Sequence, residues 1–162
     1  MVATVGVVGA GTMGAGIAQL ACLGGRRTLL HDHDPEALAA GVARVAGAVE
    51  RGAEKGRWSA EESVAALGRL VAASELKELA DCDLVIEAAP EELGLKQGLF
   101  AALEDACRAG AVLATNTSSL SVTAIAESAG QGISPGSSAC WIVATGRKRC
   151  LRASSRETNP YF

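Results

Sequence analysis

The sequence has few aromatic residues and few histidines. Phe, Trp and Tyr make up 3% of its 162 residues, and its two histidines are His31 and His33. Proteins that bind single-stranded nucleic acid stack the bases on aromatic side chains, so the scarcity of rings argues against that class. No two cysteines are spaced as C-x-x-C, and the histidines lie in one segment. A zinc site therefore has little support, and we predict no metal centre.

Strong net charge and long apolar runs are also lacking. The formal net charge is −3, which argues against a general affinity for DNA. No apolar run is long enough to span a membrane, and the start carries no basic segment of the kind that begins a signal peptide. Of the five cysteines, Cys22, Cys82 and Cys107 lie in apolar periodic segments. We expect these to be buried free thiols of a cytoplasmic protein without nucleic-acid or membrane partners.

The first sixteen residues contain a glycine pattern in a specific setting. Thr4–Val8 predicts a short buried strand, Gly9–Gly14 spells G-x-G-x-x-G, and a helix is predicted from Gly16 to Leu23. In this setting the first glycine allows a tight turn, the second lets a pyrophosphate approach the backbone, and the third lets the helix pack on the strand. The pattern predicts a dinucleotide site, whereas a simple strand–helix turn is the alternative.

An acidic residue supports the dinucleotide interpretation. The next apolar run ends in Asp32, 23 positions after Gly9. An acid at the end of the second strand accepts hydrogen bonds from the ribose 2′-OH of NAD. The alternative role for Asp32 is to cap the helix that begins at Pro35, although Asp34 is better placed for that.

Strands and helices are expected to alternate along the rest of the chain. Two predicted helices, Pro35–Glu54 and a second that runs to Leu67 after a capping box at Ser59 and Glu62, form an insertion between the second and third strands. Further strands are predicted at Leu70–Ala73, Asp83–Ala88 and Ala111–Thr115, and further helices at Ser74–Ala80, Pro90–Arg108 and Ser121–Ala129. This order predicts an α/β fold with a doubly wound, Rossmann-like parallel sheet. Glu87–Glu91 and Asn116–Ser119 then follow strand ends, as the glycine loop and Asp32 do, so all are expected to meet in one crevice.

Four stretches of the sequence resemble the NAD-binding domain of the 3-hydroxyacyl-CoA dehydrogenases. They are VGVVGAGTMGAGIAQLAC, the segment around Asp32, DCDLVIEAAPEELGLKQGLF and LATNTSSLSVTAIAE. The resemblance implies NAD as cofactor and an acyl-CoA as substrate. It implies that Gly9, Ala10, Gly11, Thr12, Met13 and Gly14 cradle the pyrophosphate and that Asp32 holds the adenosine ribose. It also places Glu91 and Lys96 beside the cofactor, Ser118 between nicotinamide and substrate, and Lys55 and Lys96 in contact with the acyl-CoA.

Each of these polar residues also has a structural alternative. Glu91 lies where acids stabilise the first turn of a helix, and Ser118 lies where a serine caps one. Lys96 and Lys55 are also compatible with ordinary solvated positions on helices.

The resemblance ends after about residue 129. Residues 1–129 contain 10 basic and 17 acidic residues, whereas residues 130–162 contain 5 and 1. We therefore divide the chain into an NAD-binding domain, 1–129, and a divergent, poorly ordered tail, 130–162, which we expect to stay out of the sheet. The family's catalytic histidine would fall near Ala139, where this sequence has none.

These features lead to one main expectation and two alternatives. The chain is expected to be the NAD-binding domain of a 3-hydroxyacyl-CoA dehydrogenase, truncated or frameshifted, without the family's helical C-terminal domain and catalytically impaired. Oligomer formation is doubtful without that domain. The alternatives are an NAD-binding module without catalysis and another Rossmann dehydrogenase that acts on a small hydroxy acid.

Overall fold

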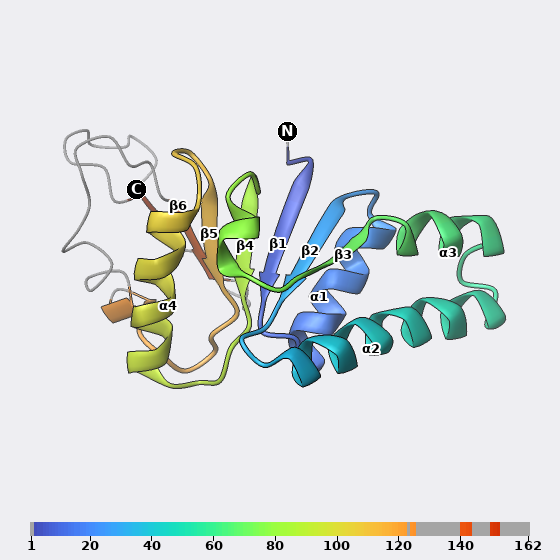
Figure 1. The fold of residues 1–162 in the computed structure, drawn as a ribbon, viewed down its shortest axis with the longest axis horizontal. Coiled ribbons are helices and arrows are strands. Elements are labelled where there is room, and N and C mark those ends of the chain that lie inside the picture. Colours follow the sequence, from blue (N-terminus) through green and yellow to red (C-terminus); the bar gives the residue numbers. More distant parts are fainter. Residues whose placement is uncertain (1, 123, 126–139, 144–149, 153–162) are drawn as a thin grey trace.

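The computed structural model describes residues 2–122, 124, 125, 140–143 and 150–152, and these residues form one sheet flanked by helices (Figure 1). The strands are β1 (Thr4–Val8), β2 (Arg27–His31), β3 (Leu70–Ala73), β4 (Leu84–Glu87), β5 (Val112–Thr115), β6 (Cys140–Val143) and β7 (Cys150–Arg152). Their order in the sheet is β3-β2-β1-β4-β5-β6-β7. All neighbouring pairs are parallel except β6 and β7, which are antiparallel. The predicted doubly wound parallel sheet is confirmed.

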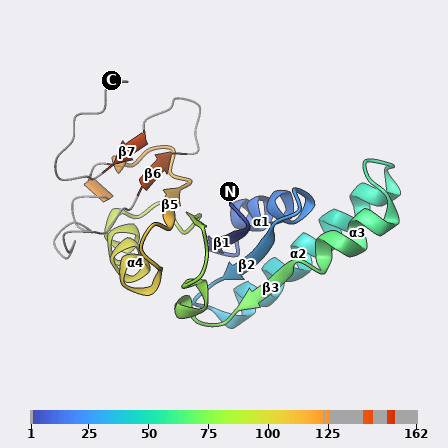
Figure 2. The ribbon, with the colours of Figure 1, turned by 90° about the horizontal axis from the view of Figure 1, so that it is seen from above.

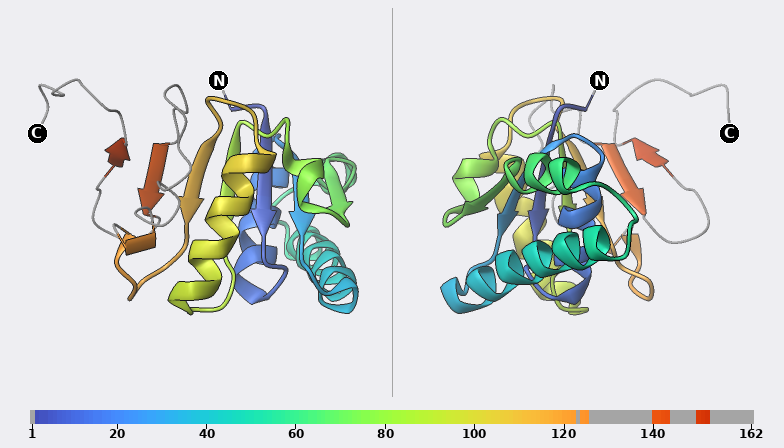
Figure 3. Two further views of the ribbon diagram at one scale, coloured as in Figure 1. Left: turned by 60° about the vertical axis from the view of Figure 1, so that its left-hand side comes forward. Right: turned by 90° about the vertical axis from the view of Figure 1, so that its right-hand side faces the viewer.

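Helices cover both faces of the sheet. They are α1 (Thr12–Leu23), α2 (Pro35–Glu54), α3 (Ala60–Leu67), the 3₁₀ helix η1 (Leu76–Leu79) and α4 (Leu93–Ala106). Figure 2 shows α1 and α4 on opposite sides of the strands. In Figure 3, α4 lies in front of the sheet in the left view, and α2 and α3 lie in front of it in the right view. The sheet is therefore covered by α1, α2 and α3 on one face and by η1 and α4 on the other.

Two apolar clusters hold these layers together, because successive residues of a strand point to opposite faces. One cluster packs α1, α2 and α3 against β1 and β2, and it includes Val7, Ala18, Leu30, Val45, Val49 and Ala66. The other packs η1 and α4 against β1, β4 and β5, and it includes Leu79, Val85, Phe100, Leu103 and Leu113. Cys22 and Cys82 are buried free thiols in these clusters, as predicted, whereas Cys107 is only half-buried. Burial raises the pKa of Cys82 to about 11.

The helical insertion begins and turns where the sequence predicts. The Asp34 side chain caps α2 by accepting a hydrogen bond from the Glu36 amide, and Ser59 and Glu62 form the expected capping box of α3. Trp58 stabilises the turn between the two helices, because its Nε1 donates a hydrogen bond to the carbonyl oxygen of Val49 on α2 at 2.9 Å. The insertion is thus a helical hairpin that extends to one side of the sheet (Figure 1). No helix among the residues described has the length and apolarity needed to cross a membrane.

Two of our expectations need correction. The first helix begins at Thr12 rather than Gly16, so its amino end lies inside the glycine pattern. Two segments of residues 130–162 belong to the sheet: β6 pairs with β5, and β7 pairs with β6. The physical reason is that the outer edge of β5 has unpaired backbone groups, and the short apolar run around Cys140–Val143 can satisfy them. The other residues of 130–162, and the predicted helix beyond Ile125, lie outside the described residues.

Candidate functional site

The glycine loop joins β1 to α1 at the carboxyl end of the sheet. Gly9 has a φ of +99°, and a Cβ there would lie 2.6 Å from the carbonyl oxygen of Ala88. A Cβ on Gly14 would lie 1.7 Å from the carbonyl oxygen of Gly9, so only glycine lets α1 approach the strand this closely. A Cβ on Gly11 would meet no atom within 4 Å. The first and third glycines are therefore required for packing, whereas the second borders open space.

Asp32 follows β2 and is tied directly to this loop. Its Oδ2 accepts a hydrogen bond from the Ala10 amide at 2.8 Å, and its Oδ1 accepts one from the Asp34 amide at 3.1 Å. The side chain is 13% exposed, and the ring of His33, which is 95% exposed, lies 3.1 Å from Oδ1. The structure thus places Asp32 beside the glycine loop, as its position at the end of the second strand predicts, and Asp34 takes the capping role.

A buried ion pair lies behind the loops that follow β4 and β5. Glu87 at the end of β4 and Lys96 on α4 have side chains that are 0% and 1% exposed, and their Oε1 and Nζ atoms are 2.6 Å apart. The other carboxylate oxygen of Glu87 accepts from the Thr115 hydroxyl at 2.6 Å. Lys96 therefore does not extend into solvent as an ordinary helix lysine would.

Glu91 joins this ion pair to the turn that carries Ser118. Its Oε1 accepts from the Thr117 hydroxyl, from the amides of Ser118 and Ser119 at 3.1 and 3.2 Å, and from the Ser119 hydroxyl at 2.9 Å. Its Oε2 lies 3.4 Å from Lys96 Nζ. The hydrogen bond from the Thr117 hydroxyl, with smaller contributions from Ser119 and Ser118, lowers the pKa of Glu91 to about 2. Glu91 is therefore a carboxylate at neutral pH, and it fixes the backbone around the exposed Ser118.

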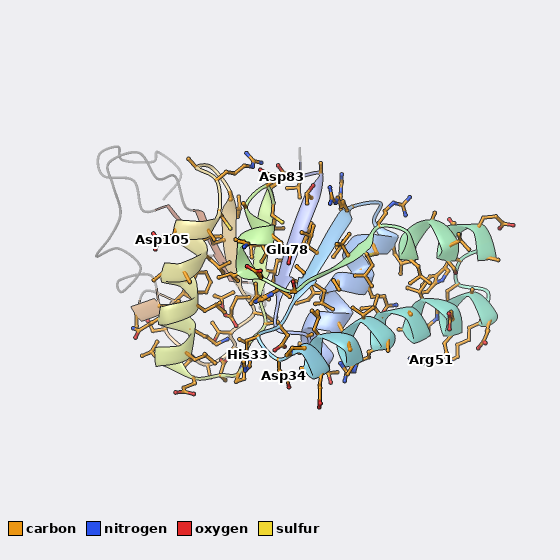
Figure 4. All side chains as sticks on the ribbon, in the orientation of Figure 1. His33, Asp34, Arg51, Glu78, Asp83 and Asp105 are labelled. Carbon is orange, nitrogen blue, oxygen red and sulfur yellow. The ribbon has the colours of Figure 1, made fainter. Side chains whose placement is uncertain are left out.

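Lys55 lies apart from these residues, at the far end of the helical hairpin. It caps the carboxyl end of α2 and lines a hollow of about 210 Å³ together with Gln19, Ala48, Arg51, Gly52 and Arg57. Figure 4 shows Arg51 far along α2, whereas His33 lies at the edge of the sheet where the strands end. Three cationic side chains thus border one hollow outside the crevice.

The structure brings most of the predicted site residues together. Gly9–Gly14 and Asp32 form one group, and Glu91, Lys96 and Ser118 form a second. The backbones of Gly9 and Ala88 are in close approach between the two groups, so both groups lie side by side at the carboxyl edge of the sheet, where a crevice is expected. Among the described residues, no cluster of His, Cys, Asp and Glu could hold a metal ion.

Sequence reasoning placed Glu87 and Thr117 in segments that meet at this edge of the sheet but gave them no individual role, and it did not single out Thr115. Glu87, Thr115 and Thr117 are buried and hydrogen-bonded there. The signal for Glu87 was present: it is a charged residue at the end of an otherwise apolar strand, and burial of such a residue requires a partner. The two threonines carry no comparable signal.

Comparison with known proteins yields one family. Residues 4–133 match the family model described as "3-hydroxyacyl-CoA dehydrogenase, NAD binding domain". The 3-hydroxyadipyl-CoA dehydrogenase of Escherichia coli is 44% identical over 125 residues, which are 77% of this chain and 26% of that protein. The 3-hydroxybutyryl-CoA dehydrogenase of Bradyrhizobium diazoefficiens is 43% identical over 122 residues, which are 75% of this chain and 42% of that protein.

Solved structures point the same way. The crystal structure of 3-hydroxybutyryl-CoA dehydrogenase from Escherichia coli superposes with a TM-score of 0.79 and 39% identity, over 88% of this chain and 29% of that one. That of (S)-3-hydroxybutyryl-CoA dehydrogenase from Ralstonia eutropha has a TM-score of 0.78 and 32% identity, over 88% and 49%. This chain thus spans less than half the length of each of these four relatives. It belongs to the 3-hydroxyacyl-CoA dehydrogenase family, and residues 4–133 match that family's NAD-binding domain.

Proposed function

We propose that this chain binds NAD(H) as the cofactor domain for the interconversion of 3-hydroxyacyl-CoA and 3-oxoacyl-CoA. The observation that carries the proposal is that the glycine loop, Asp32 and the Ser118 turn all lie at the same edge of the sheet, beyond the parallel neighbouring strands β1, β2 and β4–β5. Parallel α/β sheets bind ligands beyond the carboxyl ends of their strands, and all three groups follow strand ends in this chain.

The residues of the glycine loop fit a dinucleotide. A Cβ on Gly11 would enter open space, which is the space that a pyrophosphate needs if it is to reach the backbone amides. The loop residues Gly9, Ala10, Gly11, Thr12, Met13 and Gly14 would hold the pyrophosphate at the amino end of α1. Asp32 would accept hydrogen bonds from the adenosine ribose, and its carboxylate would repel the 2′-phosphate of NADP. We therefore propose a preference for NAD.

The second half of the crevice would hold the nicotinamide and the reacting end of the substrate. Bound NAD supplies the acceptor for the hydride that leaves the hydroxyl-bearing carbon. Ser118 is exposed at this position and would hydrogen-bond the 3-oxygen of the substrate. Glu91 and Lys96 would border the nicotinamide, Glu91 from the crevice wall and Lys96 from behind it.

The hollow on the helical hairpin would receive the coenzyme A end of the substrate. Its border includes Arg51, Lys55 and Arg57, whose positive charges suit a phosphate group. Lys55 is exposed at the helix end, so it is free to move toward a ligand.

We further propose that this chain binds NAD(H) but catalyses the reaction slowly or not at all. A positioned general base contributes typically 10²–10⁴-fold to such a reaction. The two histidines of the sequence do not lie at Ser118: the ring of His31 is buried and bonds to the carbonyl oxygen of Ala73 at 2.9 Å, and His33 lies next to Asp32. An NAD-binding module without catalysis is therefore the second candidate.

A spectrophotometric assay tests the proposal and separates the two candidates. NADH fluorescence titration should show saturable binding, and reduction of acetoacetyl-CoA, followed at 340 nm, should be slow or absent. A robust rate that Ser118→Ala abolishes would favour a full enzyme, and absence of NADH binding would refute the proposal. Acetoacetyl-CoA binding should weaken in Lys55→Ala and should not change in Lys77→Ala, a control lysine that is 76% exposed on η1.

A further inference from the structure

The buried ion pair behind the crevice makes more contacts than a simple pair. Glu87 Oε1 accepts from both Lys96 Nζ and the Ala89 amide at 2.6 Å, and its Oε2 accepts from the Thr115 hydroxyl. Lys96 Nζ also donates to the Ala89 carbonyl oxygen at 3.1 Å. Glu87 therefore joins the end of β4, the loop after it, the helix α4 and the end of β5.

Fold stability alone does not account for this arrangement. Removing two charges from water costs about as much as their attraction returns, and apolar residues of similar volume often serve equally well. The loss of one partner, in contrast, leaves an unpaired buried charge and is strongly destabilising. A buried pair does, however, hold its partners in one defined geometry, and this geometry extends here to the crevice.

The path to the crevice runs through Lys96 and Glu91. The Lys96 ammonium lies between two carboxylates, 2.6 Å from that of Glu87 and 3.4 Å from that of Glu91. The first carboxylate is fully buried and the second is 37% exposed. The exposed one accepts the hydrogen bonds of the turn that includes Ser118. Two ion pairs and a hydrogen bond thus connect Glu87, at the buried end of β4, to the backbone amide of Ser118.

We propose that Glu87 is a positioning residue: through Lys96 it fixes the Glu91 carboxylate and so holds the Ser118 turn in place for the nicotinamide half of the cofactor. We call Glu87, Lys96 and Glu91 the charged brace. The part of this inference that concerns the cofactor rests on the proposed function, whereas the ordering of the turn does not.

The first measurement needs no ligand. In the purified chain, amide hydrogen exchange should be at least tenfold faster for Ser118 and Ser119 in Glu87→Gln than in the wild type. The Ala10 amide, which donates to Asp32 in the other half of the crevice, should change by less than twofold. Glu104→Gln is the matched control, because it is the same isosteric change on α4 at a carboxylate whose Oε1 has no hydrogen-bond partner in the described structure. It should leave both sites unchanged.

The second measurement separates the two halves of the cofactor. Glu87→Gln should weaken NADH binding at least fivefold and ADP-ribose binding less than twofold, because ADP-ribose lacks the nicotinamide. A general loss of folded protein would weaken both equally. If the wild type fails to bind either ligand, the proposed function fails, and the exchange data still decide whether the brace orders the turn.

A double variant distinguishes positioning from stability. Glu87→Met combined with Lys96→Met replaces the buried pair with apolar side chains and should regain the thermal stability that Lys96→Met alone loses. It should nevertheless keep the fast exchange at Ser118 and the weak NADH binding. Restoration of both properties together with stability would overturn the proposal, as would unchanged exchange at Ser118 in Glu87→Gln.

Discussion

Two glycines of the same loop should respond in opposite ways to the same substitution. Gly11→Ala adds a methyl group that meets no atom within 4 Å, at a φ of −66° that alanine adopts freely. Gly14→Ala adds a methyl group 1.7 Å from the carbonyl oxygen of Gly9, which is backbone and cannot rotate away. The pair therefore separates the binding role of the loop from its packing role.

The expected magnitudes follow from these distances. For Gly11→Ala, a small loss at the helix cap and a small gain from the less flexible unfolded chain leave the stability within about 0.5 kcal/mol. For Gly14→Ala, overpacking against backbone should cost about 3 kcal/mol or more, which corresponds to a fall in Tm of about 6–12 °C. NADH affinity should fall at least tenfold in Gly11→Ala, since its methyl group enters the space that we assign to the pyrophosphate.

Thermal unfolding by circular dichroism and NADH titration by fluorescence measure both effects on the same samples. The reasoning predicts that Gly11→Ala is as stable as the wild type and binds poorly. It would be refuted if Gly11→Ala bound NADH with wild-type affinity, or if it lost as much stability as Gly14→Ala.

Three further predictions concern the cofactor preference, the pH dependence and the domain boundary. Asp32→Ala should lower NAD affinity by about 10- to 100-fold, as expected for loss of hydrogen bonds to a charged group, and should reduce the preference over NADP; titration with both cofactors checks this, and tighter NADP than NAD binding by the wild type would contradict it. Because the pKa of Glu91 is lowered to about 2, its carboxylate stabilises the fold at neutral pH, and this contribution is lost as the pH falls from about 5 toward 2. The stability difference between the wild type and Glu91→Gln, measured by urea unfolding, should therefore shrink over that range; a difference that grew on acidification would show that the sign is wrong. A domain boundary near residue 129 stays a prediction from composition, and limited proteolysis should cut first beyond it, whereas first cuts within residues 1–129 would contradict it.

Local signals in the sequence were sufficient for most of the fold. The Asp34–Pro35 start of α2 and the capping box at Ser59 depend on neighbouring residues, so they are visible in the sequence. The glycine loop is predictable for the same reason. In contrast, the pairing of β6 with β5 depends on an open sheet edge that is distant in the sequence. The charge balance of residues 130–162 indicated the opposite, a segment outside the sheet.

The candidate site shows the same division. Asp32 and the glycines follow a fixed spacing, so the sequence indicated them. The contact of Lys96 with Glu87 joins a strand end to a helix, and no spacing rule distinguishes it from a solvated helix lysine. Glu91 was predicted as a cofactor neighbour. Its hydrogen bonds with three residues of the Ser118 turn, however, form only because the ends of β4 and β5 lie side by side in the fold, which the sequence does not show.

The position of β1 in the middle of the sheet also affects how the chain is made. One neighbour of β1 is β2, which ends at His31, but its other neighbour, β4, begins only at Leu84. At a synthesis rate of about 5–20 residues per second, the intervening stretch takes roughly 3–10 s to emerge. During that interval the earliest strand has one unpaired edge, which is a site for wrong pairing. The helical hairpin is built from contacts close in sequence, and all of it emerges before β4 does. It can therefore cover the apolar face of β1 and β2 on its side of the sheet before β4 pairs with β1.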